Sequence, residues 1–197
     1  MTKPFSQACE NNKPHILPQL MNSFRDSKTV LEIGSGTGQH AVHFAANMPW
    51  LTWQTSDMAL NHQGISQWLN ECAATNLHHP LELDLNNAWP VSEIDAIYTA
   101  NTLHIVSWEL VQAFFKGVAQ HLNLSGKCVI YGPFNYQGKF TSDSNANFDL
   151  WLKDRDSKSG IRDFEAIIEL AENAGLSLEH DHTMPANNRL LEFTKVS

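Results

Sequence analysis

Short β-branched runs alternate with helix-like segments along most of this chain, and that alternation limits the folds it can adopt. Strands followed by helices of this length are typical of βαβ units, whose strands pair in parallel. The last two runs are separated by too few residues for a crossover connection, so we expect them to pair antiparallel. The pattern predicts one doubly wound α/β domain with a seven-stranded mixed sheet. Its strands are predicted at Thr29–Ile33, Leu51–Thr55, Leu81–Leu85, Asp95–Thr99, Lys127–Tyr131, Ser177–His182 and Leu190–Lys195.

Apolar residues at helical spacing predict helices between these strands, the first over His40–Met48.

Two segments lie outside the alternation of strands and helices. Residues 1–28 are interpreted as an N-terminal cap on the domain 1–197, and residues 135–163 form a long, polar, irregular stretch. Long connections inside compact domains are uncommon and often functional. Residues 135–163 are therefore a candidate lid, with a short helix predicted around Phe148–Leu152.

A glycine-rich loop, EIGSGTG at residues 32–38, joins the first strand to the first helix. In this context such a loop indicates nucleotide binding, because glycine permits a tight turn and lets a ligand approach the backbone. The dinucleotide fingerprint needs a further glycine where this chain has Gln39, so an NAD enzyme is disfavoured. The remaining pattern resembles motif I of the class I S-adenosylmethionine-dependent methyltransferases. The resemblance implies that the acidic residue helps to position the amino-acid end of the cofactor; the alternative is a turn that binds nothing. The candidate cofactor residues here are Glu32, Gly34, Ser35, Gly36 and Gly38.

Acidic residues follow the next two predicted strands. Asp57 ends the second strand, 19 residues after Gly38, and a carboxylate at about that distance can accept both ribose hydroxyls. Asp84 and Leu85 fall in the third-strand region, which contacts adenine in the methyltransferases that the loop resembles. The alternative interpretation is an Asx turn or helix cap for Asp57 and a surface turn for Asp84.

Polar residues also follow the fourth predicted strand, at the sheet edge where α/β proteins bind ligands. The Asn101-x-x-His104 segment resembles the corresponding region of small-molecule methyltransferases, which implies that Asn101 lies near the methionine end of the cofactor. His104 is the candidate general base, because imidazole titrates near neutral pH. The alternative for His104 is a structural, hydrogen-bonded histidine. Tyr131 ends the fifth strand and by the same geometry faces the pocket.

The resemblance extends along nearly the whole chain. It is to a small family of uncharacterised class I methyltransferase-like proteins, described as a domain of unknown function. The matching stretches include ENNKPHIL (residues 10–17), EIGSGTGQHAVHF (32–44), WQTSD (53–57), NTLHIVSW (101–108) and MPANN (184–188). One departure is Asn11, where a basic residue is expected. The resemblance implies a Rossmann-like sheet with strand order 3-2-1-4-5-7-6 and S-adenosylmethionine as cofactor, but it implies no substrate.

Several of the matching stretches are polar and fall in predicted loops, and we hypothesise that they converge over the sheet edge as a substrate pocket. Arg162 and Lys13 would then bind a carboxylate or a phosphate. The alternative for Arg162 is an ion pair with Asp156 or Asp163, and the alternative for Asn187 is a left-handed turn. The candidate substrate residues are Lys13, Tyr131, Asn135, Arg162 and Asn187.

Composition narrows the class of function. The chain has 13 Lys and Arg against 21 Asp and Glu, a formal charge of −8, which argues against a general nucleic-acid binder. The three cysteines form no CxxC pair, and His40 and His43 have no third ligand in view, so we expect no metal site. The N-terminus lacks the apolar region of a secretory signal, and no apolar run is long enough to span a membrane. The expectation is a cytoplasmic protein.

The sequence therefore predicts an S-adenosylmethionine-dependent methyltransferase that acts on a small-molecule acceptor. A second hypothesis is a non-catalytic protein that binds S-adenosylmethionine or S-adenosylhomocysteine and has a regulatory or partner-binding role. An α/β-hydrolase is disfavoured, because the chain has no GxSxG motif.

Overall fold

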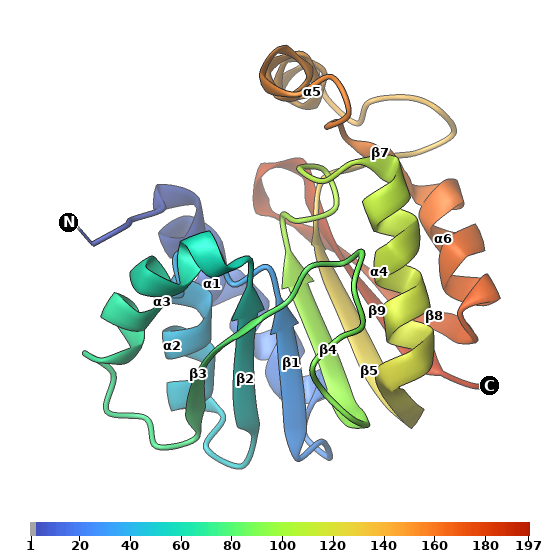
Figure 1. Ribbon diagram of the computed structural model, residues 1–197. Coiled ribbons are helices and arrows are strands. Elements are labelled where there is room, and N and C mark those ends of the chain that lie inside the picture. Colours follow the sequence, from blue (N-terminus) through green and yellow to red (C-terminus); the bar gives the residue numbers. More distant parts are fainter. Residues whose placement is uncertain (1–2) are drawn as a thin grey trace.

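A seven-stranded sheet runs through the computed structural model, which describes residues 3–197 (Figure 1). The strand order is β3-β2-β1-β4-β5-β9-β8. Strands β1 to β5 are parallel, whereas β9 is antiparallel to both of its neighbours. Because β8 and β9 are the sixth and seventh strands of this sheet along the chain, the predicted order and the antiparallel last strand are confirmed. The bounds are β1 Thr29–Ile33, β2 Thr52–Asp57, β3 Leu77–Glu82, β4 Ile94–Ala100, β5 Leu122–Gly132, β8 Leu176–Met184 and β9 Asn188–Lys195.

Helices cover both faces of the sheet. On one face α1 and α2 pack against buried strand residues that include Trp53 and Tyr98. On the other face α4 and α6 enclose a core that includes Ile97 and Phe193. Among residues 3–197, no helix combines the length and the apolar character that crossing a bilayer requires. The bounds are α1 Gln7–Ser23, α2 Gln39–Asn47, α3 His62–Leu69, α4 Trp108–His121, α5 Asp143–Arg155 and α6 Phe164–Asn173, with short elements η1 Ala59–Asn61, β6 Phe134–Asn135, β7 Arg162–Asp163 and η2 Pro185–Asn187.

The third strand begins four residues earlier than predicted. It covers Leu77–Glu82 instead of Leu81–Leu85, because the chain turns at Asp84, whose carbonyl accepts from the Asn87 amide at 2.9 Å. The strand contains Pro80 and two exposed histidines, so its sequence lacks the alternation of apolar and polar residues that predicts a strand. Since β3 is an edge strand with a partner on one side only, a missing proline N–H is tolerated there.

Most of the region interpreted as an N-terminal cap is a helix that the sequence did not predict. Residues 1–2 of that region lie outside the described residues. Helix α1 contains Pro14 and Pro18, which normally end or bend a helix. Both prolines are exposed, while the opposite side buries Ile16 and Leu20 against α2 and the sheet. Packing of that apolar side offsets the hydrogen bonds that the prolines cannot make.

The region 135–163 is not irregular, which corrects the sequence interpretation. It contains α5, longer than the short helix predicted around Phe148–Leu152, and it is joined to the sheet edge by the two-stranded pair of β6 and β7. The Ser142 hydroxyl caps α5 by accepting from the Asn145 amide at 3.1 Å. Figure 1 shows α5 standing beyond the carboxyl ends of the parallel strands, apart from the main body.

Candidate functional site

The glycine-rich loop follows β1 directly and adopts a conformation that suits glycine. Gly34, Gly36 and Gly38 all have positive φ, at 72°, 59° and 88°. A Cβ added at Gly34 would lie 2.7 Å from the Thr102 hydroxyl oxygen, so the loop packs tightly against the segment that follows β4. The sequence therefore needs glycine here for both backbone conformation and space.

Glu32 lies beneath this loop and is buried. Its carboxylate accepts from the Ser35 hydroxyl at 2.9 Å and from the Trp53 indole nitrogen at 3.1 Å. Burial raises the pKa of Glu32 to about 7, although these two hydrogen bonds lower it in part. In the structure Glu32 thus anchors the first turn of the loop through Ser35.

Asp57 connects the end of β2 to the same loop. One carboxylate oxygen accepts from the Gly36 amide at 2.8 Å, and the other accepts from the Asn61 side chain at 2.7 Å. Gly36 and Asn61 also border a hollow of about 220 Å³, together with Pro4 of the N-terminal segment. The structure therefore brings the predicted loop and the predicted ribose-binding acid together.

Asp84 and Leu85 lie in the turn after β3. The Asp84 carboxylate accepts from the Asn86 amide at 2.9 Å, as the turn interpretation expects. Leu85 is half-buried and packs against the core on the α4 side. Their link to the loop is indirect: the Leu83 amide, one residue earlier, donates to the Asp57 carbonyl at 3.0 Å.

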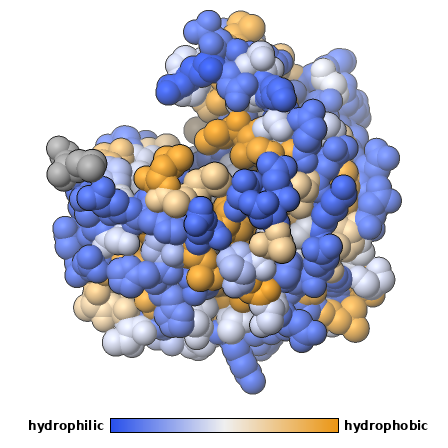
Figure 2. Space-filling view, in the orientation of Figure 1, coloured by the Kyte–Doolittle hydropathy of each residue, from blue (hydrophilic) through white to orange (hydrophobic). Residues whose placement is uncertain are grey.

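Asn101, His104 and Tyr131 line one cavity of about 660 Å³ at the carboxyl edge of the sheet. Its other walls come from α1, from α5 and from the β8–β9 hairpin. In the space-filling view the surface is hollowed below α5, and hydrophobic side chains are visible in the hollow (Figure 2). Three sequence candidates, two from the turn after β4 and one from β5, therefore border the same open cavity. Wall residues that are not among the individual site candidates include three asparagines from polar stretches and two aromatic residues: Asn12, Asn145, Asn188, Phe148 and Trp151.

His104 is buried in the wall of this cavity. Its ring contacts Phe148 edge-on, with centroids 5.3 Å apart and an interplanar angle of 75°. Burial, and to a lesser extent the nearby Arg162 cation, lower the pKa of His104 to about 4. The imidazole is therefore neutral at physiological pH and can accept a proton.

Asn101 adopts φ of 60°, a left-handed conformation that few residues other than glycine adopt. Its amide donates to the Tyr131 carbonyl at 2.8 Å, which ties the ends of β4 and β5 together. Backbone strain of this kind clusters at functional sites in proteins.

The other candidate substrate residues do not line the cavity. Arg162 donates to the carbonyls of Leu103, Val106 and Lys158 and so ties its segment to the turn after β4. The structure thus gives Arg162 a role in holding loops, through carbonyl oxygens and not through the predicted carboxylates. Lys13 forms an ion pair with Glu10 at 2.5 Å.

Asn135 and Asn187 lie near the cavity but outside its lining. Asn135 is buried, and its side-chain nitrogen lies 3.5 Å from the Ile161 carbonyl. Asn187 has φ of 58°, in agreement with the turn interpretation, and its carbonyl accepts from the Asn145 side chain at 3.2 Å. Asn187 therefore joins the hairpin to α5.

Three polar stretches that lie far apart in the sequence converge on the cavity. They are the N-terminal Asn-Asn pair, the Ser-Asn pair at the start of α5 and the Pro-Ala-Asn-Asn hairpin. Their polarity in predicted loops was the signal that identified them. The aromatic residues Phe148 and Trp151 gave no such signal, because aromatic residues more often belong to a core.

Gln39, the residue that breaks the dinucleotide pattern, has a structural role. Its side chain accepts from the Ser6 amide and donates to Glu10, both at 2.6 Å. It thus anchors the start of α1 beside the glycine-rich loop. No motif in the sequence indicates this contact, which joins residues about 30 positions apart.

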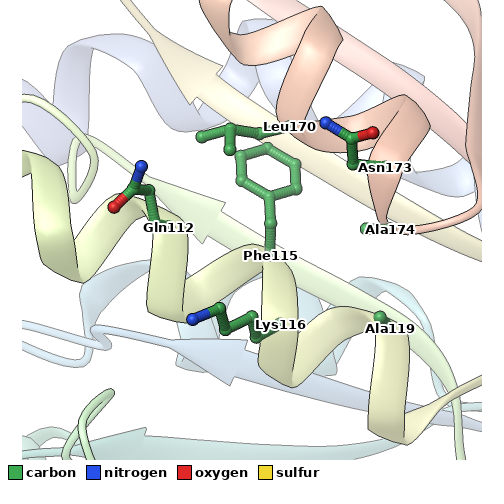
Figure 3. Close-up of a pocket in the computed structure, with 7 residues that line it drawn as sticks. All are labelled: Gln112, Phe115, Lys116, Ala119, Leu170, Asn173 and Ala174. Carbon is green, nitrogen blue, oxygen red and sulfur yellow. The ribbon is translucent and has the colours of Figure 1, made fainter.

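A further hollow, of about 330 Å³, lies between α4 and α6 (Figure 3). Phe115 of α4 and Leu170 of α6 point toward each other there. None of the candidate site residues lines it. It therefore adds nothing to the site at the carboxyl edge of the sheet.

Comparison with protein families gives one match over nearly the whole chain. The model described as "Protein of unknown function (DUF938)" matches residues 3–195. The match covers both the sheet and the α5 region.

Solved structures with the same fold include proteins described as O-methyltransferases or as an S-adenosylmethionine-dependent methyltransferase. An O-methyltransferase family protein from Burkholderia thailandensis has a TM-score of 0.83 at 16% identity, covering 94% of this chain and 56% of its own. An O-methyltransferase family 2 protein from Planctomyces limnophilus, in complex with apigenin, has a TM-score of 0.84 at 15% identity, covering 96% and 58%. PigF with SAH has a TM-score of 0.78 at 14% identity, covering 91% and 54%. This chain spans a little over half the length of those proteins, and the likeness establishes the fold.

Proposed function

The chain belongs to the DUF938 family of proteins of unknown function, and from this premise we propose that it is an S-adenosylmethionine-dependent methyltransferase for a small-molecule acceptor. The observation that carries the proposal is the juxtaposition of two features at one sheet edge. The glycine-rich loop and Asp57 form one feature, and the cavity bordered by Asn101 and His104 forms the other. Ligands of open α/β sheets bind at this edge.

The residues at this edge fit S-adenosylmethionine. The Asp57 carboxylate is positioned to accept ribose hydroxyls, and the exposed Gly36 leaves the loop backbone open to a ligand. Asp84 and Leu85 are proposed to border the adenine, and Asn101 the methionine end. The structural neighbours support this assignment, since one is described as bound to SAH and another as an S-adenosylmethionine-dependent methyltransferase.

S-adenosylmethionine, when bound, supplies an electrophilic methyl group. The protein's contribution is then to align the acceptor and to exclude water from it. Neutral His104 accepts the proton of an acceptor hydroxyl or amine as that atom becomes a nucleophile. We propose that residues 1–28 cap the site and that residues 135–163 act as its lid, within one domain. The cap is tied to the loop by Gln39, and α5 forms one wall of the cavity.

Calorimetric titration with S-adenosylmethionine and, separately, with NAD tests the cofactor. We expect S-adenosylmethionine to bind and NAD to give no heat of binding, because the loop lacks the third glycine of the dinucleotide fingerprint. Absence of S-adenosylmethionine binding would overturn the proposal.

Incubation with a metabolite extract then tests for catalysis. Formation of S-adenosylhomocysteine that depends on the extract is the expected result. Binding of the cofactor without turnover across extracts of different origin would favour the alternative of a non-catalytic S-adenosylmethionine-binding protein.

A further inference from the structure

The cavity bordered by His104 has an uncharged lining. Among the described residues, its walls contain no Asp, Glu, Lys or Arg, but five asparagines and two serines. Its one histidine is neutral at physiological pH. An ionised acceptor would lose its hydration in this space without meeting a countercharge, which is costly.

Several charged side chains of the elements around this cavity make contacts elsewhere in the protein. Arg162 donates to three carbonyls, and Lys13 is paired with Glu10. Asp149 of α5 is buried and accepts from Lys153 at 2.6 Å. The Arg155 guanidinium lies over the Trp151 ring at 4.5 Å. None of these charged side chains lines the cavity.

Aromatic rings form one side of the cavity. Phe148 and Trp151 stack with centroids 5.7 Å apart and an interplanar angle of 18°. Phe148 also touches the His104 ring, so a planar molecule against Phe148 lies beside the candidate base. The asparagine amides come from α1, α5, the hairpin and the turn after β4. Some of their groups bond within the protein, as the Asn145 nitrogen does to Thr141 and Asn187, and the remaining donors and acceptors line the cavity.

We propose that the methyl acceptor is an uncharged aromatic compound, bound with its ring against Phe148 and its polar substituents on the surrounding asparagine amides. This inference rests on the proposed function, because it names the acceptor class of that site. The volume of about 660 Å³ is within the range of small-molecule pockets. Phe148 is assigned as a specificity-determining residue, and its neighbour His104 as the group that faces the reacting substituent.

Matched probes test the charge and the ring separately. Calorimetry compares 2-naphthol, which is neutral at pH 7, with 2-naphthoate, which has the same rings and a negative charge. Each is titrated into the ligand-free protein and into protein saturated with S-adenosylhomocysteine. We expect 2-naphthol to bind at least about tenfold more tightly, because the carboxylate is desolvated without a partner.

A phenylalanine-to-leucine variant and a matched control test the role of Phe148 in the cavity wall. Phe148→Leu keeps an apolar side chain and should weaken 2-naphthol binding about fivefold or more, while the saturated analogue decahydro-2-naphthol is affected less. Phe140→Leu, at an exposed phenylalanine outside the cavity lining, is the control and should change the affinity for neither compound.

Equal or tighter binding of 2-naphthoate, or unchanged 2-naphthol binding by Phe148→Leu, would overturn the inference. Failure of the proposed function looks different: S-adenosylhomocysteine would not bind to the wild-type protein. The 2-naphthol titration of the ligand-free protein reports on the acceptor class independently of that result.

Discussion

Asp57 is the residue on which the candidate cofactor site depends most directly, because its carboxylate contacts both the loop and Asn61. Asp57→Asn replaces one acceptor oxygen with an NH2 donor. That donor cannot accept from the Gly36 amide or from a ribose hydroxyl, so a hydrogen bond is lost. We expect the Kd for S-adenosylmethionine to rise about tenfold or more, measured by calorimetry. The control is Asp26→Asn, an exposed carboxylate paired with Arg25. Equal affinities for the two variants would contradict the assignment.

His104 permits a kinetic prediction with a defined pH signature. Because its pKa is lowered to about 4, the imidazole is in its basic form throughout the range above that pH. The acid limb of kcat/KM should therefore lie near pH 4 and not near 6.5. His104→Asn should reduce turnover of an active extract by about 100-fold or more while leaving S-adenosylmethionine affinity unchanged. A variant with wild-type turnover would assign the histidine a structural role.

Helix α1 is attached to the body of the protein through a buried polar contact. The Asn12 side-chain oxygen lies 2.6 Å from His40 Nε2, and Tyr98 lies 3.3 Å from the other ring nitrogen. Asn12→Ala leaves a buried nitrogen without its partner, which costs roughly 1–3 kcal/mol. Urea denaturation at pH 7 should show this loss. Asn11→Ala, at the exposed neighbouring position, should change stability by less than about 0.5 kcal/mol.

Helix α5 is held over the cavity by Asp149. Its buried carboxylate accepts from the Ile161 amide at 2.8 Å and pairs with Lys153. Asp149→Asn replaces the charged acceptor of the Ile161 amide with a neutral one and should weaken this attachment by about 1–2 kcal/mol. Hydrogen exchange should then become faster across Asp143–Arg155 and stay unchanged in β1 to β5. The exposed Asp154→Asn on the same helix is the control. Equal exchange in both variants would show that the attachment lies elsewhere.

At the scale of the whole molecule, three buried titratable groups shape the pH dependence of stability. The pKa of His40 is lowered to about 3 and that of His104 to about 4, both by burial. Below their ordinary value of 6.5 the unfolded chain binds protons at these sites that the folded protein does not, so stability falls on acidification. Glu32 acts in the opposite sense, because its pKa is raised from 4.5 to about 7. Its stabilising contribution is complete below pH 4.5 and is lost as the pH rises through 7.

Replacement of Glu32 should make the free energy of unfolding fall more steeply as the pH decreases. Between pH 5 and 6.5, Glu32→Gln abolishes a proton that only the folded state binds, so the slope of unfolding free energy against pH should increase by up to about 1.4 kcal/mol per pH unit. Urea denaturation across that range measures it. The exposed Glu169→Gln on α6 should leave the slope unchanged. A shallower slope for Glu32→Gln would contradict the raised pKa.

The sheet could be predicted from local patterns, and so could the site residues that lie next to its strands. Glycine spacing identified the loop, and the polar residues after β4 identified Asn101 and His104, because chain order alone delivers the carboxyl ends of parallel strands to one edge. Local patterns failed where a residue's surroundings override its propensity. Pro80 is tolerated at a sheet edge, and Pro14 and Pro18 are tolerated in a helix whose other side is buried.

The sequence by itself determined the α/β class and the glycine-rich loop, because both depend on residues close together in the chain, whereas the strand order followed from the family resemblance. Only the tertiary structure decided which loops meet. It placed Asn12 on His40, joined Gln39 to the start of α1, turned Arg162 onto carbonyls and set Phe148 against His104. These contacts link positions 28 to 59 residues apart. Such pairs are selected by the packing of whole elements, which no local spacing encodes.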